Sequence, residues 1–228
     1  MIDSDSLFTS TGGTGVTKDR LLDAAERLFA EHGFQATSLR HITADAGVNL
    51  AAVNYHFQSK ESLILAVLIR KLEPINRRRL ELLDELEARQ RDSAPSLEGV
   101  LRAFLQPVLE AKAAGMELAT FPRLLGRIYT EPGAWIEKLI PKVFGEVMGR
   151  FKTAFAAALP GAEPVEVAWG IHFAIGSMAH FLAAGKLLEL ISQGAADESD
   201  SAGTLERLVV FTASGMRAMV LRTKEAAG

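Results

Sequence analysis

The chain has 228 residues, of which 48% are apolar, and its formal net charge is −3 at pH 7. This length suits one large domain or two small domains that share a core. The sequence has no cysteine, which excludes disulfides, thiolate zinc sites and cysteine nucleophiles and is compatible with the cytoplasm. The slight negative charge argues against a surface that is basic throughout, but it does not exclude a local basic patch that binds DNA.

Residues 1–16 are rich in serine, threonine and glycine and include Asp3 and Asp5. They contain no basic stretch followed by an apolar run, which is the pattern of a secretory signal. We therefore expect residues 1–16 to form a flexible tail and the protein to be cytoplasmic.

After this tail, apolar residues recur at steps of three and four residues, which is the helical period. The first set consists of Leu21, Leu22, Ala25, Leu28 and Phe29. It predicts a helix over residues 18–32, ended by Gly33 in a left-handed conformation. Thr37 or Ser38 is then expected to cap a short helix over residues 39–45.

A second short helix is predicted over residues 50–56, with Asn49 as its N-cap. Ser59 is expected to cap a long helix that begins at Lys60. Pro74 is expected to interrupt or end this long helix, because proline lacks the backbone donor and clashes with the preceding turn.

The rest of the chain is also helical in pattern. Helices are predicted over residues 97–113, 121–129, 133–159, 165–192 and 204–223. A polar, acidic loop over residues 193–203 separates the last two helices, and Thr204 is expected to cap the last one. No strand-like alternation persists anywhere in the sequence, which predicts an all-α fold.

The segment LRHITADAGVNLAAVNYHFQSK, residues 39–60, has the form of a helix-turn-helix. Ala44 is small enough for the two helices to approach each other, and Gly47 tolerates the conformation of a tight turn. The apolar seam between the helices consists of Ile42, Val48 and Val53. The second helix exposes small and polar residues, which can enter the major groove of DNA.

At these residues the sequence resembles the DNA-binding domain of the tetracycline-repressor (TetR) family. The resemblance rests on LLDAAERLFAEHGF, TSLRHITADAGV and AVNYHFQSKESL, of which the last is the most diagnostic. It implies an all-α protein with a helix-turn-helix head over residues 17–62. A long helix would join this head to a C-terminal bundle over residues 63–228, which binds ligand and forms a dimer.

The function implied by the resemblance is that of a ligand-responsive repressor without enzymatic activity or a cofactor. The repressor would bind a palindromic operator in double-stranded DNA as a homodimer. The AVNYHF form and the stretch LEPINRRRLELLDEL also resemble the branch of the family that responds to fatty acids and acyl-CoA.

The resemblance also implies roles for individual residues of the head. Base edges would be contacted by Asn49, Leu50, Ala51 and Ala52, and Asn54 could contact either bases or the backbone. Phosphates would be contacted by Thr37, Ser38, Tyr55, His56 and Lys60. Alternatives remain, because asparagine is an ordinary N-cap and a Tyr-His pair can simply pack against a short helix.

Residues 1–62 contain more acidic than basic side chains. DNA binding would then depend on a few placed cations, neutral donors and helix N-termini, with a shallow salt dependence. The net negative charge of residues 1–62 also leaves an alternative function, that of a helical ligand-binding or interaction protein without sequence-specific DNA binding. Arg77, Arg78 and Arg79 stand among acidic residues, which favours a solvated helix face over a nucleic-acid patch.

The C-terminal part is rich in aromatic residues and methionine, which suit a bundle core or the lining of a pocket. The candidate ligand-binding residues are Phe104, Phe121, Leu125, Tyr129, Trp135, Phe144, Met148, His172 and Phe173. Plain packing in the core is the alternative for each of them. We expect a small apolar effector, such as an acyl chain or an aromatic compound. No metal is expected, because His172 and His180 lack further ligands at suitable spacing.

Residues 167–185 contain no Asp, Glu, Lys or Arg. Their length is close to the roughly 18 apolar residues of a membrane span, but their histidines, serine and glycines favour a buried helix instead. We expect no membrane association. A homodimer interface is predicted from residues 165–190 and 204–222, with Phe181 as a test position. The residues predicted to contribute from the last helix are Leu205, Leu208, Val209, Ala213 and Met216.

Overall fold

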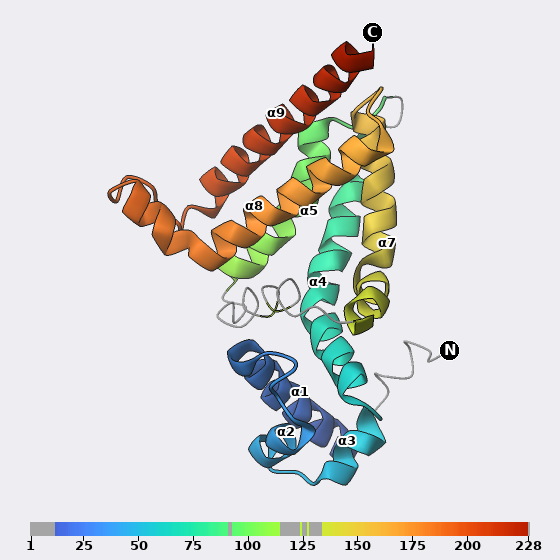
Figure 1. Ribbon diagram of the computed structural model, residues 1–228, viewed down its shortest axis with the longest axis vertical. Coiled ribbons are helices and arrows are strands. Elements are labelled where there is room, and N and C mark those ends of the chain that lie inside the picture. The colour runs from blue at the N-terminus through green and yellow to red at the C-terminus, as the bar shows by residue number, and fades with distance from the viewer. Residues whose placement is uncertain (1–11, 91–92, 115–123, 125–126, 128–133, 228) are drawn as a thin grey trace.

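The computed structural model describes residues 12–90, 93–114, 124, 127 and 134–227. Every regular element in this part of the chain is an α-helix, which confirms the all-α prediction (Figure 1). The helices are α1 (Gly12–His32), α2 (Leu39–Ala46), α3 (Leu50–His56), α4 (Lys60–Arg89), α5 (Leu97–Ala113), α7 (Ala134–Ala158), α8 (Pro164–Ile191) and α9 (Ser201–Ala227).

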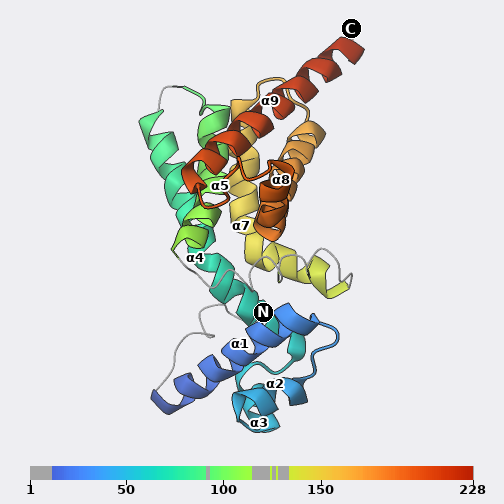
Figure 2. The ribbon, with the colours of Figure 1, turned by 90° about the vertical axis from the view of Figure 1, so that its left-hand side faces the viewer.

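The molecule consists of a small head and a larger bundle. Helices α1, α2 and α3 pack together as the head, and α4 runs from the head into the bundle, where it packs against α5 and α7. Helices α8 and α9 lie side by side as an outer layer over α5 and α7 (Figure 2). Helix α4 is therefore the continuous element that joins the two parts.

Side-chain caps start the helices of the head as the sequence predicts. Ser38 accepts a hydrogen bond from the His41 backbone N–H at 3.1 Å, and Asn49 accepts one from Ala52 at 3.0 Å. Gly47 ends α2 with φ of +63°, a left-handed conformation that glycine adopts without the steric cost of a Cβ. These caps fix the turn between α2 and α3.

Helix α4 begins at Lys60, with Ser59 as its N-cap, but the prediction that Pro74 interrupts or ends it is wrong. The helix continues through Pro74 to Arg89. Leu72 and Ile75, on either side of the proline, are both buried in the bundle. Their packing holds the helix together, although proline removes one hydrogen bond to the carbonyl of Arg70.

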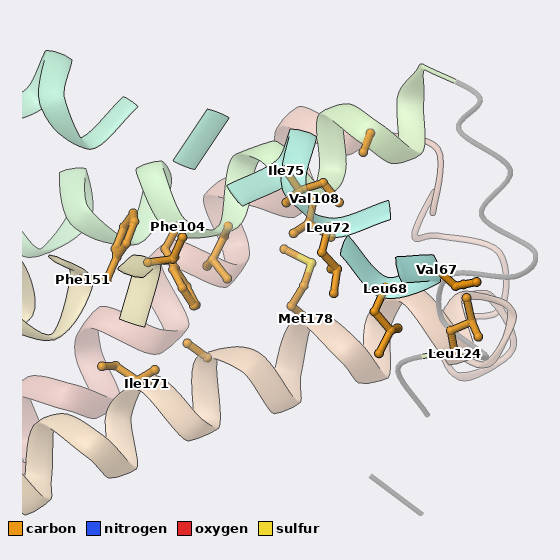
Figure 3. Packing of buried hydrophobic residues seen from close by; sticks show 14 of the residues in the cluster. Val67, Leu68, Leu72, Ile75, Phe104, Val108, Leu124, Phe151, Ile171 and Met178 are labelled. Atoms are coloured by element: carbon orange, nitrogen blue, oxygen red, sulfur yellow. The ribbon is translucent and has the colours of Figure 1, made fainter. Parts of the chain in front are cut away.

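The core of the bundle is aromatic where α5 meets α7. The Phe104 and Phe151 rings lie 5.0 Å apart between centroids, and Phe155 packs against both. Figure 3 shows Phe104 beside Phe151 and, farther along, Met178 of α8 pointing toward Leu72 of α4. The core thus connects α4 to both α7 and α8.

The last helix begins at Ser201, so the prediction that Thr204 caps it is wrong. Thr204 is buried inside the helix. The Gly203 N–H instead donates to the Asp200 carboxylate at 2.8 Å, because aspartate accepts bonds from the first turn of a helix. Most of the predicted helix over residues 121–129 lies outside the described residues, but Leu124 and Arg127 are helical.

Helix α8 is long and apolar enough to cross a membrane by composition alone. Only 22% of its most apolar window is buried in the single chain. Its backbone leaves helical geometry at Ala184, where φ is −132° and ψ is 30°. An apolar helix that is this exposed in one chain requires another cover, and the nature of that cover bears on function.

Candidate DNA-binding surface and ligand cavity

Helix α3 turns one apolar side toward the head and the rest toward solvent. Val53 is fully buried, and Ala52 packs against the core. Leu50, Ala51 and Asn54 are exposed. Tyr55 is 75% exposed, which is more than packing of a tyrosine in the head would leave. The predicted base-reading side of α3 is thus open to solvent, and Ala52 is at its edge.

The two N-cap residues of the helix-turn-helix are exposed as well as structural. Ser38 and Asn49 each use one side-chain oxygen to accept from the helix that they begin. The Ser38 hydroxyl hydrogen and the Asn49 amide N–H groups remain chemically capable of donation. Capping and DNA contact are therefore compatible at both positions.

Thr37 does not belong to the exposed surface. Its side chain has no exposed area, and its hydroxyl lies 2.7 Å from the Gly33 carbonyl and 3.1 Å from the Leu28 carbonyl, to which it donates. This geometry corrects the prediction that Thr37 contacts phosphate through its side chain. The hydroxyl instead ties the end of α1 to the segment before α2.

Tyr55 and His56 stand at the end of α3, with their rings edge-on at 5.0 Å between centroids. Burial, and then the nearby charge of Lys18, hold the pKa of His56 below its ordinary value. The imidazole is therefore neutral at pH 7, with one N–H donor and one acceptor. Lys18 is a cation of this surface that the sequence analysis did not single out.

Lys60 is half-buried at the start of α4, and its Nζ donates to the Gln35 carbonyl at 3.2 Å. This bond ties the loop before α2 to the first turn of α4. The ammonium group has three donors, so its predicted phosphate contact is compatible with this bond.

Ion pairs account for several of the acidic residues that make the head sequence net negative. Arg70 of α4 pairs with Asp23 at 2.8 Å and with Glu26 at 2.8 Å, while Lys71 pairs with Glu26 at 2.7 Å. Two acidic residues of α1 are thus neutralised by cations that lie outside residues 1–62. The head is less negative electrostatically than its own residue count indicates.

A cavity of about 240 Å³ lies inside the bundle between α4, α5, α7 and α8. Its lining residues are Leu72, Ile75, Arg79, Phe104, Leu105, Val108, Ile140, Phe144, Met148, Ile175, Met178, Ala179 and Leu182. Three of the predicted ligand-binding residues, Phe104, Phe144 and Met148, are among them. The position next to α4 places this cavity against the element that carries the head.

The other predicted ligand-binding residues do not line the cavity in the described part of the chain. His172 and Phe173 are exposed on the outer side of α8 and border a surface groove shared with α9, so they lie outside this cavity. Phe121, Leu125 and Tyr129 lie outside the described residues, as does the side chain of Trp135.

Arg79 is the cavity residue that the sequence analysis missed. It is 8% exposed, so its interpretation as part of a solvated helix face is wrong, whereas Arg77 is exposed. The signal was present in the sequence, because Arg79 follows Leu72 by seven residues and Ile75 by four, which places it on the same helix face. No group of three or more metal-ligating side chains occurs among the described residues.

Two protein families match this chain, one for each part of the structure. Residues 21–67 match bacterial regulatory proteins of the tetR family, and residues 102–215 match the tetracyclin repressor-like C-terminal domain, which is half of the chain. The chain belongs to the TetR family. It is therefore a helix-turn-helix transcriptional regulator rather than an enzyme, as the sequence predicts.

Curated relatives of this TetR protein match it over short stretches of about a quarter of the chain. A dual regulator from Shigella flexneri, CecR, is 51% identical over 49 residues, which are 22% of this chain and 22% of that protein. The repressor KstR2 from Rhodococcus jostii is 41% identical over 58 residues, 25% of this chain and 28% of that protein. The chain thus spans about a quarter of the length of these relatives.

Solved structures match the whole TetR fold. NalD, described as the secondary repressor of a multidrug efflux pump in Pseudomonas aeruginosa, is 24% identical with a TM-score of 0.59, over 87% of this chain and 97% of that one. The fatty acid degradation regulator FadR from Bacillus halodurans is 13% identical with a TM-score of 0.58, over 92% and 99%. At these identities the match establishes the fold alone.

Proposed function

We propose that this protein is a homodimeric repressor in the cytoplasm, which binds a palindromic operator. Its affinity for the operator changes, in either direction, when a small apolar ligand enters the bundle. The observation that carries this proposal is the position of the cavity beside α4, which also carries the recognition head. We place the boundary between the DNA-binding and ligand-binding parts along α4, close to residue 62.

The DNA-binding surface of this proposal is α3 with its flanking caps. Small side chains such as Ala51 let the helix approach base edges, and Asn49 and Asn54 offer amide groups to them. Tyr55 and His56 supply neutral donors for phosphates at the end of the helix. We expect this surface to be shared by both copies of the dimer, about 34 Å apart or somewhat more.

The dimer of this proposal is formed by the outer face of α8 and α9. The large apolar residues exposed on this face are Val165, Trp169, Phe173, Val210, Phe211 and Leu221. A second copy related by a two-fold axis would cover them in a four-helix interface. Val209, Ala213 and Met216, which the sequence pattern suggested for this interface, are instead buried within the single chain.

The link from ligand to DNA is α4 and its contacts with the head. The α1 carboxylate of Glu26 holds α4 through Arg70 and Lys71, just before Pro74. Cavity residues of α4 lie on both sides of this proline, Leu72 before it and Ile75 and Arg79 after it. A second contact is the Arg127 guanidinium, which donates to the Glu31 carbonyl at the end of α1 at 3.0 Å. A shift of α4 therefore moves the head.

The proposal is tested by selecting bound sequences from a random pool of DNA duplexes. We expect an inverted repeat whose half-sites are one helical turn apart or somewhat more. Enrichment of asymmetric single sites would contradict the dimeric arrangement. Failure to enrich any sequence would favour a helical ligand-binding protein without sequence-specific DNA binding.

A further inference from the structure

The cavity in the bundle has one charged residue in its described wall. Every other described lining residue is aliphatic, aromatic or methionine, whereas Arg79 brings a guanidinium to the wall from α4. A cation in an apolar wall interacts more strongly with an anion than it would in water, because the surrounding dielectric is low. The chemistry of the wall therefore distinguishes a ligand with an anionic group from one without.

The guanidinium of Arg79 is held in a fixed orientation. Its Nε donates to the Phe104 carbonyl at 2.8 Å, and its Nη1 donates to the Asn76 side-chain oxygen at 3.1 Å. Asn76 is itself anchored, because its amide donates to the Val143 carbonyl at 2.9 Å. The guanidinium carbon also lies 4.5 Å from the centroid of the Phe104 ring. These contacts pre-organise the group before any ligand arrives.

The volume of the cavity indicates the size of ligand that would fill it. A cavity of about 150 Å³ holds one benzene molecule, and this cavity is about 240 Å³. Scaling by volume gives about ten non-hydrogen atoms. Pockets for drug-sized ligands begin at about 300 Å³, so the site suits a smaller molecule.

We propose that the cavity binds an apolar monocarboxylate of about ten non-hydrogen atoms, a medium-chain fatty acid such as octanoate. Its carboxylate pairs with the Arg79 guanidinium through a charge-assisted hydrogen bond, while Nε and Nη1 keep their bonds to Phe104 and Asn76. Its chain lies among Ile140, Phe144 and Met148 of α7 and Ile175 of α8. This inference rests on the proposed function, since it assigns the class of ligand to the same cavity.

The pairing would act directly on the helix that carries the head. Arg79 belongs to α4 and lies five residues after Pro74, where the helix lacks one backbone hydrogen bond. Because Arg79 is fixed on α4, a carboxylate bound to it, with its chain against α7 and α8, ties the bundle half of α4 to these helices. The acid is therefore expected to change operator affinity, while a neutral compound of equal length fills the cavity with a smaller effect.

The test is calorimetric titration of the full chain at pH 7.5 with octanoate, methyl octanoate and 1-octanol. We expect octanoate to bind at least about tenfold more tightly than either neutral probe, because a charge-assisted bond is roughly twice as strong as a neutral one. The Arg79→Met variant is expected to lose this preference and to keep its affinity for 1-octanol. The matched control is Arg78→Met, because Arg78 is half-buried and does not line the cavity. This variant should keep the preference for octanoate over the neutral probes.

The outcomes separate this inference from the proposed function. Equal binding of the acid and its methyl ester by the unmodified chain, or no binding of any probe, would overturn the assignment whatever the variants do. Octanoate binding that leaves operator affinity unchanged would instead contradict the ligand switch of the proposed function. If Arg79→Met fails to fold, which circular dichroism reports, the comparison of acid and ester on the unmodified chain still decides.

Discussion

Replacement of Glu26 by glutamine tests whether the head and α4 act as one body. The Glu26 side chain is 7% exposed and bridges Arg70 and Lys71 at 2.8 Å and 2.7 Å. The substitution keeps the shape of the side chain and removes its charge. Both cations then lose their shared buried partner, although Arg70 still has the exposed Asp23 carboxylate.

The expected loss of stability lies between two known limits. Removing one partner of a fully buried pair costs about 3–5 kcal/mol, and an exposed pair contributes about 0–1 kcal/mol. Here the carboxylate is buried but both cations reach solvent, so we expect about 2 kcal/mol. For a chain of this size, that loss lowers Tm by about 4–8 °C.

The assay is thermal unfolding followed by circular dichroism, together with operator titrations with and without ligand. We expect Glu26→Gln to lower Tm and to reduce the effect of ligand on operator affinity, while ligand affinity itself stays constant. The control is Asp23→Asn, whose exposed carboxylate should matter by less than about 2 °C. An unchanged Tm and an unchanged ligand effect in Glu26→Gln would refute the mechanical role of this contact.

Four further outcomes follow from the geometry. Phe211→Arg places a charge on the exposed α9 face and should give monomers by light scattering, whereas a folded dimer would place the interface elsewhere. Phe181 is a poorer test position, because the Lys112 Nζ lies 4.6 Å from the centroid of its ring. A phosphate near His56 would stabilise the imidazolium that burial and Lys18 disfavour, so binding takes up a proton. Operator affinity should therefore rise as pH falls from 7.5 to 6, and His56→Gln should weaken this rise; equal pH profiles would remove the contact. Tyr55→Phe should weaken binding to cognate and unrelated DNA alike, by about 0.5–1.5 kcal/mol, and a loss confined to the cognate site would indicate base contact instead. Thr37→Val should destabilise the fold by about 1–3 kcal/mol, because the Gly33 carbonyl loses the hydroxyl donor 2.7 Å away. DNA affinity should stay unchanged once the variant is folded, and preserved stability would contradict the buried role.

The sequence predicts the head well because its signals are local. Ser38, Asn49 and Ser59 each cap a helix through their own side chain and the backbone three residues on. Gly47 marks a turn that other residues adopt at a cost. These features depend on short stretches of chain, so their positions follow from the residues themselves.

Tertiary packing determines the features of this protein that local sequence patterns do not predict. Pro74 is a helix breaker by local rules, yet the buried neighbours Leu72 and Ile75 keep α4 continuous. Helix α8 is apolar on nearly every side, so its pattern does not tell the cavity side from the outer side. The pattern therefore does not separate His172 and Phe173, which lie outside the cavity, from Ile175, Met178, Ala179 and Leu182, which line it.

The most direct test of the central claim is the affinity of the selected palindromic duplex, measured by fluorescence anisotropy at fixed salt with and without saturating octanoate. The account predicts that ligand changes operator affinity by about 5- to 150-fold, which corresponds to a coupling of about 1–3 kcal/mol. The same change should shrink in Glu26→Gln, where the contact between α4 and α1 is weakened. An operator affinity that stays constant while octanoate demonstrably occupies the bundle would contradict it.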